Sequence, residues 1–211
     1  MQLHCFGESG HSYKVALALT LHGLDWEPLH VDFFNGATRS PEYLRDVNDM
    51  GEAPVLIDGD VRLTQSGVIL DYLTEKTGRF GGETPDERRE VLRWMLWDNH
   101  KMSSQAGVLR FLRNFIPAEK RPEQVIAFLE GRLAAALKVL DRHLTQRDWL
   151  AGRGVTNADL SCCSYLYYDE PFGFERADWP NIDRWLTRIA ELDGWQHPYD
   201  LMRPAYQDRT R

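Results

Sequence analysis

The chain has 211 residues, of which 43% are hydrophobic and 27% charged, and its formal net charge at pH 7 is −7. These values indicate an ordinary globular protein of one or two domains. Lys and Arg are scattered, which argues against a nucleic-acid partner. No membrane span is expected, because the sequence contains no run of about 18 apolar residues. The first ten residues lack the pattern of a signal peptide, so we expect a cytoplasmic protein.

Short strands alternate with helices in the first third of the chain. In chain order, the pattern predicts a strand at 2–6, a helix at 12–23, a strand at 26–33 and a short helix at 41–47. A hairpin follows, with apolar strands on either side of Asp58-Gly59, a pair that favours a type I′ turn. The next helix begins at Gln65 and Ser66, and its free N–H groups would attract a carboxylate or phosphate.

The chain changes character after a Gly-rich segment at 78–85, which indicates a linker. Beyond it we expect only helices. One long helix is predicted from Pro85 to about Phe115, and a second at 123–144 carries a leucine stripe typical of a bundle core. Further helices are predicted at the Thr156–Asp159 capping box and at 183–192. The predicted domains are an α/β domain at 1–78 and an all-helical domain at 85–211.

The loop after the first strand, residues 7–12, carries two hydroxyl groups, Ser9 and Ser12, next to a helix N-terminus. A serine-hydrolase elbow is excluded, because the fifth residue of the motif is His11 instead of Gly. The spacing of the two serines is that of a redox Cys-x-x-Cys, but hydroxyl groups cannot exchange disulfides. Either serine could be only a helix cap, which we favour for Ser12. The histidines and the three cysteines have no metal-ligand spacing, so no metal is expected.

Over essentially its whole length the chain resembles the cytosolic-type glutathione transferases. Four segments carry the resemblance by their order and spacing: residues 9–15, 51–56, 65–73 and the capping box at 156–159. The family has a thioredoxin-like first domain and an all-helical second domain. The resemblance therefore implies glutathione as cosubstrate and a homodimer.

The resemblance also implies roles for particular residues. Ser9 matches the hydroxyl that faces the glutathione sulfur in serine-type members, and would be the catalytic residue. Ala53 matches the residue before a cis-proline, Pro54, whose backbone pairs with the cysteinyl unit of glutathione. Gln65 and Ser66 match the pair that holds the γ-glutamyl group.

This sequence departs from the family pattern near the glycyl carboxylate of glutathione. Glu52 stands where many members have Lys or Arg, and Asp49 stands where many have Pro. We take Arg39 as the candidate that replaces the missing cation.

The predicted reaction is conjugation of the glutathione thiolate to small hydrophobic electrophiles, as in detoxification. Isomerisation, peroxide reduction and dehalogenation on the same site remain alternatives, as does a non-catalytic interaction module. The electrophile pocket is expected to be lined by the first long helix, where His100, Met102 and Arg110 cannot be ranked from sequence. The aromatic stretch at 94–97 adds weak support for a dimer, because exposed apolar patches often mark interfaces.

Overall fold

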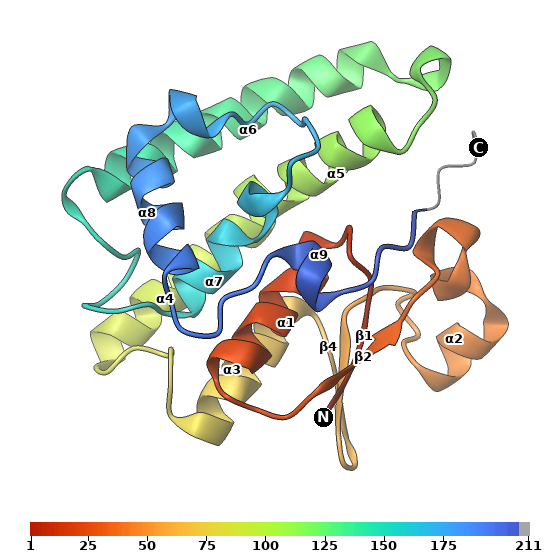
Figure 1. Ribbon diagram of the computed structural model, residues 1–211, viewed down its shortest axis with the longest axis horizontal. Helices are drawn as coiled ribbons and strands as arrows, with labels where there is room; N and C mark the ends of the chain where they lie inside the picture. The colour runs from red at the N-terminus through yellow and green to blue at the C-terminus, as the bar shows by residue number, and fades with distance from the viewer. Residues whose placement is uncertain (207–211) are drawn as a thin grey trace. The chain divides into compact units, whose positions relative to one another are not determined.

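The computed structural model describes residues 1–206 of the chain. It consists of two compact units (Figure 1). The first unit is Met1–Arg79 together with the described residues from Asp193, and the second is Phe80–Leu192. An α/β first unit and an all-helical second unit confirm the predicted fold class. The predicted domain bounds stay a prediction, but the chain after residue 192 groups with the first unit, whereas we had assigned it to the helical one.

Within residues 1–206 the first unit holds a four-stranded sheet with strand order β2-β1-β3-β4. The strands are β1 (Gln2–Cys5), β2 (Glu27–His30), β3 (Val55–Asp58) and β4 (Val61–Thr64). β1 pairs in parallel with β2 and antiparallel with β3, and the β3–β4 pair is antiparallel. The hairpin turn differs from the prediction. Gly59 has a φ of 61°, whereas Asp60 does not have a positive φ, so the pattern fits a type II′ turn and not type I′.

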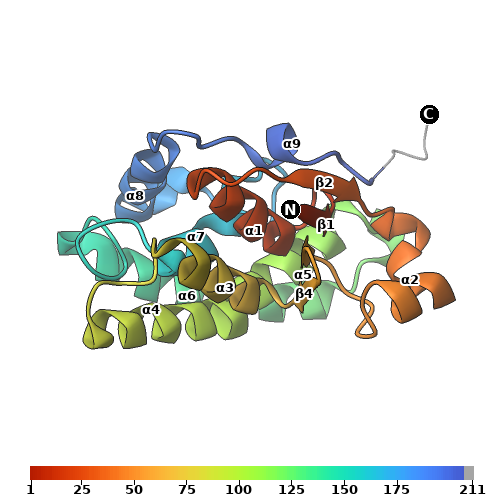
Figure 2. The same ribbon diagram turned by 90° about the horizontal axis from the view of Figure 1, so that it is seen from below.

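Helices cover both faces of this sheet (Figure 2). The helical segments of the first unit are α1 (Gly10–Leu21), η1 (Phe33–Asn35), η2 (Ala37–Arg39), α2 (Pro41–Asp46), α3 (Ser66–Thr77) and α9 (Pro198–Leu201). α1 and α3 lie side by side on one face, and α2 lies on the opposite side. α1 is buried nearly all round, which explains its apolar composition. It stops before Gly23, whose φ of 71° a residue with a side chain rarely adopts.

The second unit is built from helices alone in the region that the structure describes. They are α4 (Pro85–Trp97), a π-helical segment (Asp98–Met102), α5 (Ser103–Asn114), η4 (Ala118–Lys120), α6 (Glu123–His143), η5 (Leu144–Gln146), α7 (Asn157–Cys163), η6 (Ser164–Tyr167), η7 (Arg176–Asp178) and α8 (Pro180–Ala190). The predicted leucine stripe of α6 lies in the core, since Leu133, Leu137 and Leu140 are fully buried. α8 begins at Pro180, three residues earlier than predicted.

The predicted long helix is widened in its middle by the π-helical segment. The carboxylate of Asp98, which is fully buried, accepts hydrogen bonds there from the hydroxyls of Ser103 (2.8 Å) and Ser161 (2.6 Å). π-Segments insert an extra residue into a helix, and buried carboxylates need such donors. The sequence pattern did not reveal this interruption, because apolar residues continue at helical spacing on both sides.

The capping box at the start of α7 forms as predicted. The carboxylate of Asp159 accepts from the Thr156 N–H (2.8 Å), from the Leu150 N–H (2.9 Å) and from the Trp185 indole N–H (2.9 Å). Burial raises the pKa of Asp159 to about 6. Its role is structural: it joins α7, α8 and the preceding loop.

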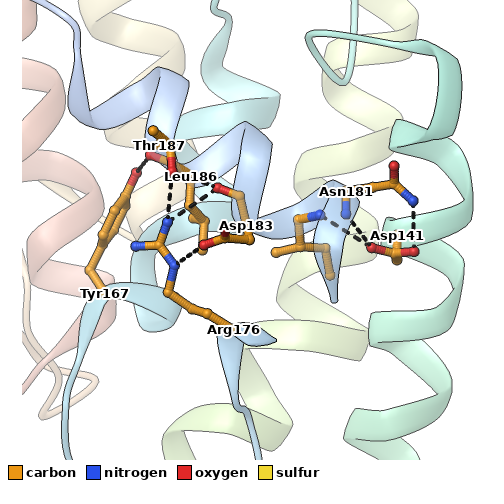
Figure 3. A network of polar contacts seen from close by, with 8 residues as sticks. Asp141, Tyr167, Arg176, Asn181, Asp183, Leu186 and Thr187 are labelled. Atoms are coloured by element: carbon orange, nitrogen blue, oxygen red, sulfur yellow. Dashed lines mark hydrogen bonds and ion pairs between the residues drawn. The ribbon is translucent and has the colours of Figure 1, made fainter. Parts of the chain in front are cut away.

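α8 is fixed by side chains from other segments (Figure 3). Asp141 of α6 accepts from the backbone N–H of Asn181 (3.0 Å) and of Ile182 (3.2 Å), so it caps a helix that lacks a capping side chain of its own. Arg176 donates to the Asp183 carboxylate at 2.6 Å, and the Tyr167 hydroxyl donates to the Leu186 carbonyl at 2.8 Å.

Candidate functional site

Ser9 lies between β1 and α1 and is the N-cap of α1. Its Oγ atom accepts a hydrogen bond from the Ser12 N–H at 3.1 Å, and the side chain is 7% exposed. The cap is therefore Ser9, and our preference for Ser12 as the cap was wrong. Ser12 lies inside the helix and is fully buried. No acceptor for the Ser9 hydroxyl hydrogen is found among residues 1–206, so this hydrogen is available to a ligand.

The Ala53–Pro54 peptide bond is cis, as predicted, and lies next to the end of β1. β3 begins directly after it and pairs antiparallel with β1, with Val55 opposite His4. Ala53 packs against the cluster that contains Phe6, three residues before Ser9. The sheet thus brings the Ala53–Pro54 bond close to the Ser9 loop.

Two side chains that the sequence did not single out hold the segment before Pro54. The Tyr43 hydroxyl and the Asn48 amide each donate to the Glu52 carbonyl at 2.9 Å. Asn48 is 4% exposed, and buried polar groups need such partners. A buried Asn between a helix and a turn is a weak sequence signal, because Asn is common in surface turns.

Gln65 and Ser66 stand between β4 and α3. Gln65 has a φ of 66°, which is uncommon for a residue with a side chain and is often found at functional sites. Ser66 is the first residue of α3 and is 5% exposed, so its N–H belongs to a free helix N-terminus. The arrangement suits a carboxylate ligand.

The contact between His11 and Ser66 joins the N-termini of α1 and α3, with 3.4 Å between the Nδ1 and Oγ atoms. Burial and, to a smaller extent, the charge of Lys14 lower the pKa of His11 to about 3. His11 is therefore neutral at pH 7, and it brings no positive charge to Ser66 or to Ser9.

Glu52, the acidic residue that stands where many family members have Lys or Arg, contacts Gln65 in the same group of residues. Gln65 donates to the Glu52 carboxylate through its side-chain nitrogen at 2.8 Å, which leaves its side-chain oxygen as an acceptor. Arg39 ends η2 and is exposed. A Cβ placed on Gly51 would lie 3.1 Å from the Thr38 carbonyl, so the Arg39 segment packs closely on the loop that carries Glu52.

Cys5 and the residue types that bind metals give no further candidate site within the described part of the chain. Burial raises the pKa of the Cys5 thiol to about 12, so this cysteine is not a nucleophile at neutral pH. Within residues 1–206 no group of three or more His, Cys, Asp or Glu residues is arranged to hold a metal ion. No helix in this part of the chain is long and apolar enough to cross a membrane.

The three pocket candidates of the helical unit have different surroundings. His100 is exposed, whereas Met102 is 2% exposed and belongs to the core. Arg110 is also buried. It pairs with Glu170 at 2.9 Å, and its guanidinium lies 3.7 Å from the centre of the Tyr168 ring.

Comparison with known proteins gives the class to which this fold and these residues belong. Residues 1–75 match the family model for the glutathione S-transferase N-terminal domain, and residues 103–193 match the model for the C-terminal domain. The chain therefore belongs to the glutathione S-transferase family, and it is an enzyme of that family with a thioredoxin-like first domain.

The relatives of the chain are named for different reactions. It is 31% identical to glutathione S-transferase F10 of Arabidopsis thaliana, over 88% of this chain and 90% of that protein. It is also 31% identical to the maleylacetoacetate isomerase of Pseudomonas aeruginosa, over 100% of this chain and 99% of that protein. The crystal structure of a glutathione S-transferase from Xanthobacter autotrophicus superposes with a TM-score of 0.85 at 30% identity, covering 94% of this chain and 98% of the other.

Proposed function

We propose that this enzyme conjugates the thiolate of glutathione to small hydrophobic electrophiles, and that Ser9 is its catalytic residue. One observation carries the proposal. The Ser9 oxygen is occupied by the Ser12 N–H, so the hydroxyl hydrogen is left to donate to a bound sulfur. In this arrangement Ser9 stabilises a thiolate and does not act as a base.

The energetics are consistent with this role. A free thiol has a pKa of about 8.5, and holding it as a thiolate at neutral pH requires about 3 kcal/mol. A hydrogen bond to a charged partner contributes about 1.5–3 kcal/mol. The N-terminus of α1 adds about 0.3–1 kcal/mol. Ser9 and the helix that it caps can supply the required free energy together.

Glutathione itself would be held by the residues grouped around Ser9. The backbone of Ala53 and Pro54 would pair with the cysteinyl unit. Gln65 and Ser66 would hold the γ-glutamyl group, with its carboxylate at the N-terminus of α3 and its ammonium group at the free side-chain oxygen of Gln65. Arg39 would contact the glycyl carboxylate. No metal is required for this reaction.

A second reaction on the same site has one specific observation in its favour. The relative from P. aeruginosa is named as an isomerase, and the match to it spans the whole of this chain. Isomerisation of a cis-alkene by addition and loss of a thiolate would use the same Ser9 hydroxyl. Peroxide reduction and dehalogenation need the same thiolate too, whereas a non-catalytic module would not need the Ser9 hydroxyl hydrogen to be available.

A single activity screen separates these reactions. The purified protein is incubated with glutathione and, in parallel, with an aryl halide, an alkyl halide, a hydroperoxide and a cis-unsaturated diketo acid. We expect turnover of the aryl halide at a rate well above the uncatalysed reaction. Turnover of the diketo acid alone would replace the conjugation proposal with isomerisation, and no turnover of any substrate would refute both.

We further propose a cytoplasmic detoxification enzyme that works as a homodimer. The exposed apolar side chains of α4 support the dimer. Leu92 and Leu96 are 54% and 62% exposed and lie one helical turn apart.

A further inference from the structure

The loop that carries Ser9 is bonded to a segment almost two hundred residues away in the sequence. Glu8 is buried, with 6% of the residue exposed. Its Oε2 atom accepts from the Ala205 N–H at 2.9 Å, and its Oε1 atom accepts from the Tyr206 N–H at 2.8 Å. Two consecutive backbone donors thus hold both oxygens of one carboxylate, a strong charge-assisted arrangement.

Gly7 adds a second connection to the same segment. Its N–H donates to the Arg203 carbonyl at 2.8 Å. A Cβ placed on Gly7 would lie 3.0 Å from both the Met202 carbonyl oxygen and the Pro204 nitrogen. The loop backbone and the C-terminal segment are therefore in direct contact, and a side chain at position 7 would force the backbone of that segment to shift.

Apolar contacts support these hydrogen bonds. Ala205 belongs to the same buried cluster as Phe6, the residue before Gly7. The ring of Tyr206 lies 5.1 Å from the ring of Phe34, which packs on this cluster. We call residues 203–206 the C-terminal strap.

The chain leading to the strap is also attached on the other side of Ser9. Tyr13, in the first turns of α1, donates through its hydroxyl to the Gln196 carbonyl at 2.8 Å. Ser9 lies between these two attachments, and its own orientation depends on the Ser12 N–H. A shift of the loop relative to α1 would lengthen that bond.

We propose that Glu8 is a positioning residue for the reaction: by binding the C-terminal strap it holds the Ser9 loop in the orientation that stabilises the glutathione thiolate. The inference rests on the proposed role of Ser9. It gives residues 203–206 a role in positioning Ser9, although they are far from Ser9 in the sequence.

The sign of the effect separates positioning from a simple charge effect. A carboxylate near a thiolate repels it, and removal of the negative charge would therefore lower the pKa of the bound thiol. Loss of positioning has the opposite result, because a displaced Ser9 hydroxyl no longer stabilises the thiolate.

The first experiment compares Glu8→Gln with Glu75→Gln, which removes the same charge from an exposed residue of α3. The thiolate absorbance of bound glutathione is followed against pH. We expect the pKa of the bound thiol to rise by about one unit in Glu8→Gln, which is about a tenfold loss of thiolate well below the pKa. Glu75→Gln should be unchanged. A lower or unchanged pKa in Glu8→Gln would overturn the proposal.

The second experiment changes the strap and leaves the charge in place. Ala205→Pro removes one of the two N–H groups that bind Glu8, and we expect a rise in thiol pKa as in Glu8→Gln. If Glu8 acts through the strap, the double variant Glu8→Gln/Ala205→Pro should be no worse than the single variants, because residues that act as a unit are not additive. Additive effects would mean that the two residues act independently, which contradicts the proposal.

A third measurement needs no glutathione, and so it distinguishes failure of this inference from failure of the proposed function. Hydrogen exchange of the Ser12 amide reports the bond to Ser9 directly. We expect faster exchange in Glu8→Gln and in Ala205→Pro, and wild-type exchange in Glu75→Gln. Unchanged exchange at Ser12 in both variants would refute the positioning role, whatever reaction the enzyme performs.

Discussion

The Nδ1 atom of His11 lies 3.4 Å from the Oγ atom of Ser66, although the two residues are 55 positions apart. The contact places the first turn of α1 against the first turn of α3, so the free N–H groups of two helices are close together. Because His11 is neutral at pH 7, it is the helix ends and the hydroxyls of Ser9 and Ser66 that would attract the anionic groups of glutathione in the binding mode that we propose.

The first prediction concerns glutathione affinity. Ser66→Ala should weaken binding by about 1–3 kcal/mol, because the ligand carboxylate loses a charge-assisted hydrogen bond. Calorimetric titration measures the change. Ser66→Thr keeps the hydroxyl and serves as the control. Wild-type affinity in Ser66→Ala would mean that this hydroxyl does not bind the ligand.

The second prediction concerns thiol activation. Ser9→Ala should raise the pKa of bound glutathione and slow conjugation at pH 7, while affinity is largely retained. The loss of the cap should also lower the free energy of unfolding by about 1 kcal/mol. An absorbance titration of the thiolate tests the assignment, with Ser12→Ala as the matched variant. A shift in Ser12→Ala and none in Ser9→Ala would reverse the roles of the two serines.

The third prediction concerns stability in acid. Burial, assisted by the charge of Arg79, lowers the pKa of His22 from 6.5 to about 4. The unfolded chain binds a proton at this residue between pH 6.5 and 4 and the folded chain does not. Protonation of His22 therefore costs the folded state nothing above pH 6.5. The free energy of unfolding decreases as the pH falls from 6.5 towards 4.

Comparison with a variant isolates this effect. In His22→Gln the decline of unfolding free energy from pH 6.5 to 4 should be smaller by up to about 3 kcal/mol. The raised pKa of Asp159 has the opposite effect and favours the folded state as the pH falls from about 6 to 4. It is common to both proteins and cancels in the difference. Identical pH profiles from urea denaturation would rule out a buried neutral His22.

The fourth prediction concerns the buried carboxylate of the helical unit. Asp159→Ala should lower the unfolding free energy by about 3 kcal/mol or more, because the donors of Leu150, Thr156 and Trp185 lose their acceptor in the core. Glu191→Ala, at an exposed position just after α8, should change it by less than about 0.5 kcal/mol. Equal effects of the two substitutions would contradict the structural role.

The fifth prediction concerns assembly. We expect a dimer in light scattering at micromolar concentration, and a mass near the 24.5 kDa of one chain would refute it. The double variant Leu92→Glu/Leu96→Glu should favour the monomer, because it replaces exposed apolar surface with charge. If the variant stays dimeric while folded, this face of α4 is not the interface.

The sequence by itself determined the order of elements and most helix starts. Helix ends are set by local backbone geometry, so they can be read from neighbouring residues alone. Examples are Pro85, Gly23 and the Thr156–Asp159 pair. The leucine stripe of α6 was predictable for a similar reason, since burial follows helical periodicity.

Tertiary structure alone decided which distant groups meet. His11 contacts Ser66, the C-terminal strap donates two hydrogen bonds to Glu8, and Ser161 donates to the buried carboxylate of Asp98. Each of these contacts joins segments that are far apart in the chain. Local propensity carries no information about such pairs, because their free energy comes from desolvation and hydrogen bonding that exist only once the segments have packed. The choice between Ser9 and Ser12 has the same explanation. Either serine could cap a helix from its position in the sequence, and the point at which β1 ends decides that Ser9 is the cap of α1.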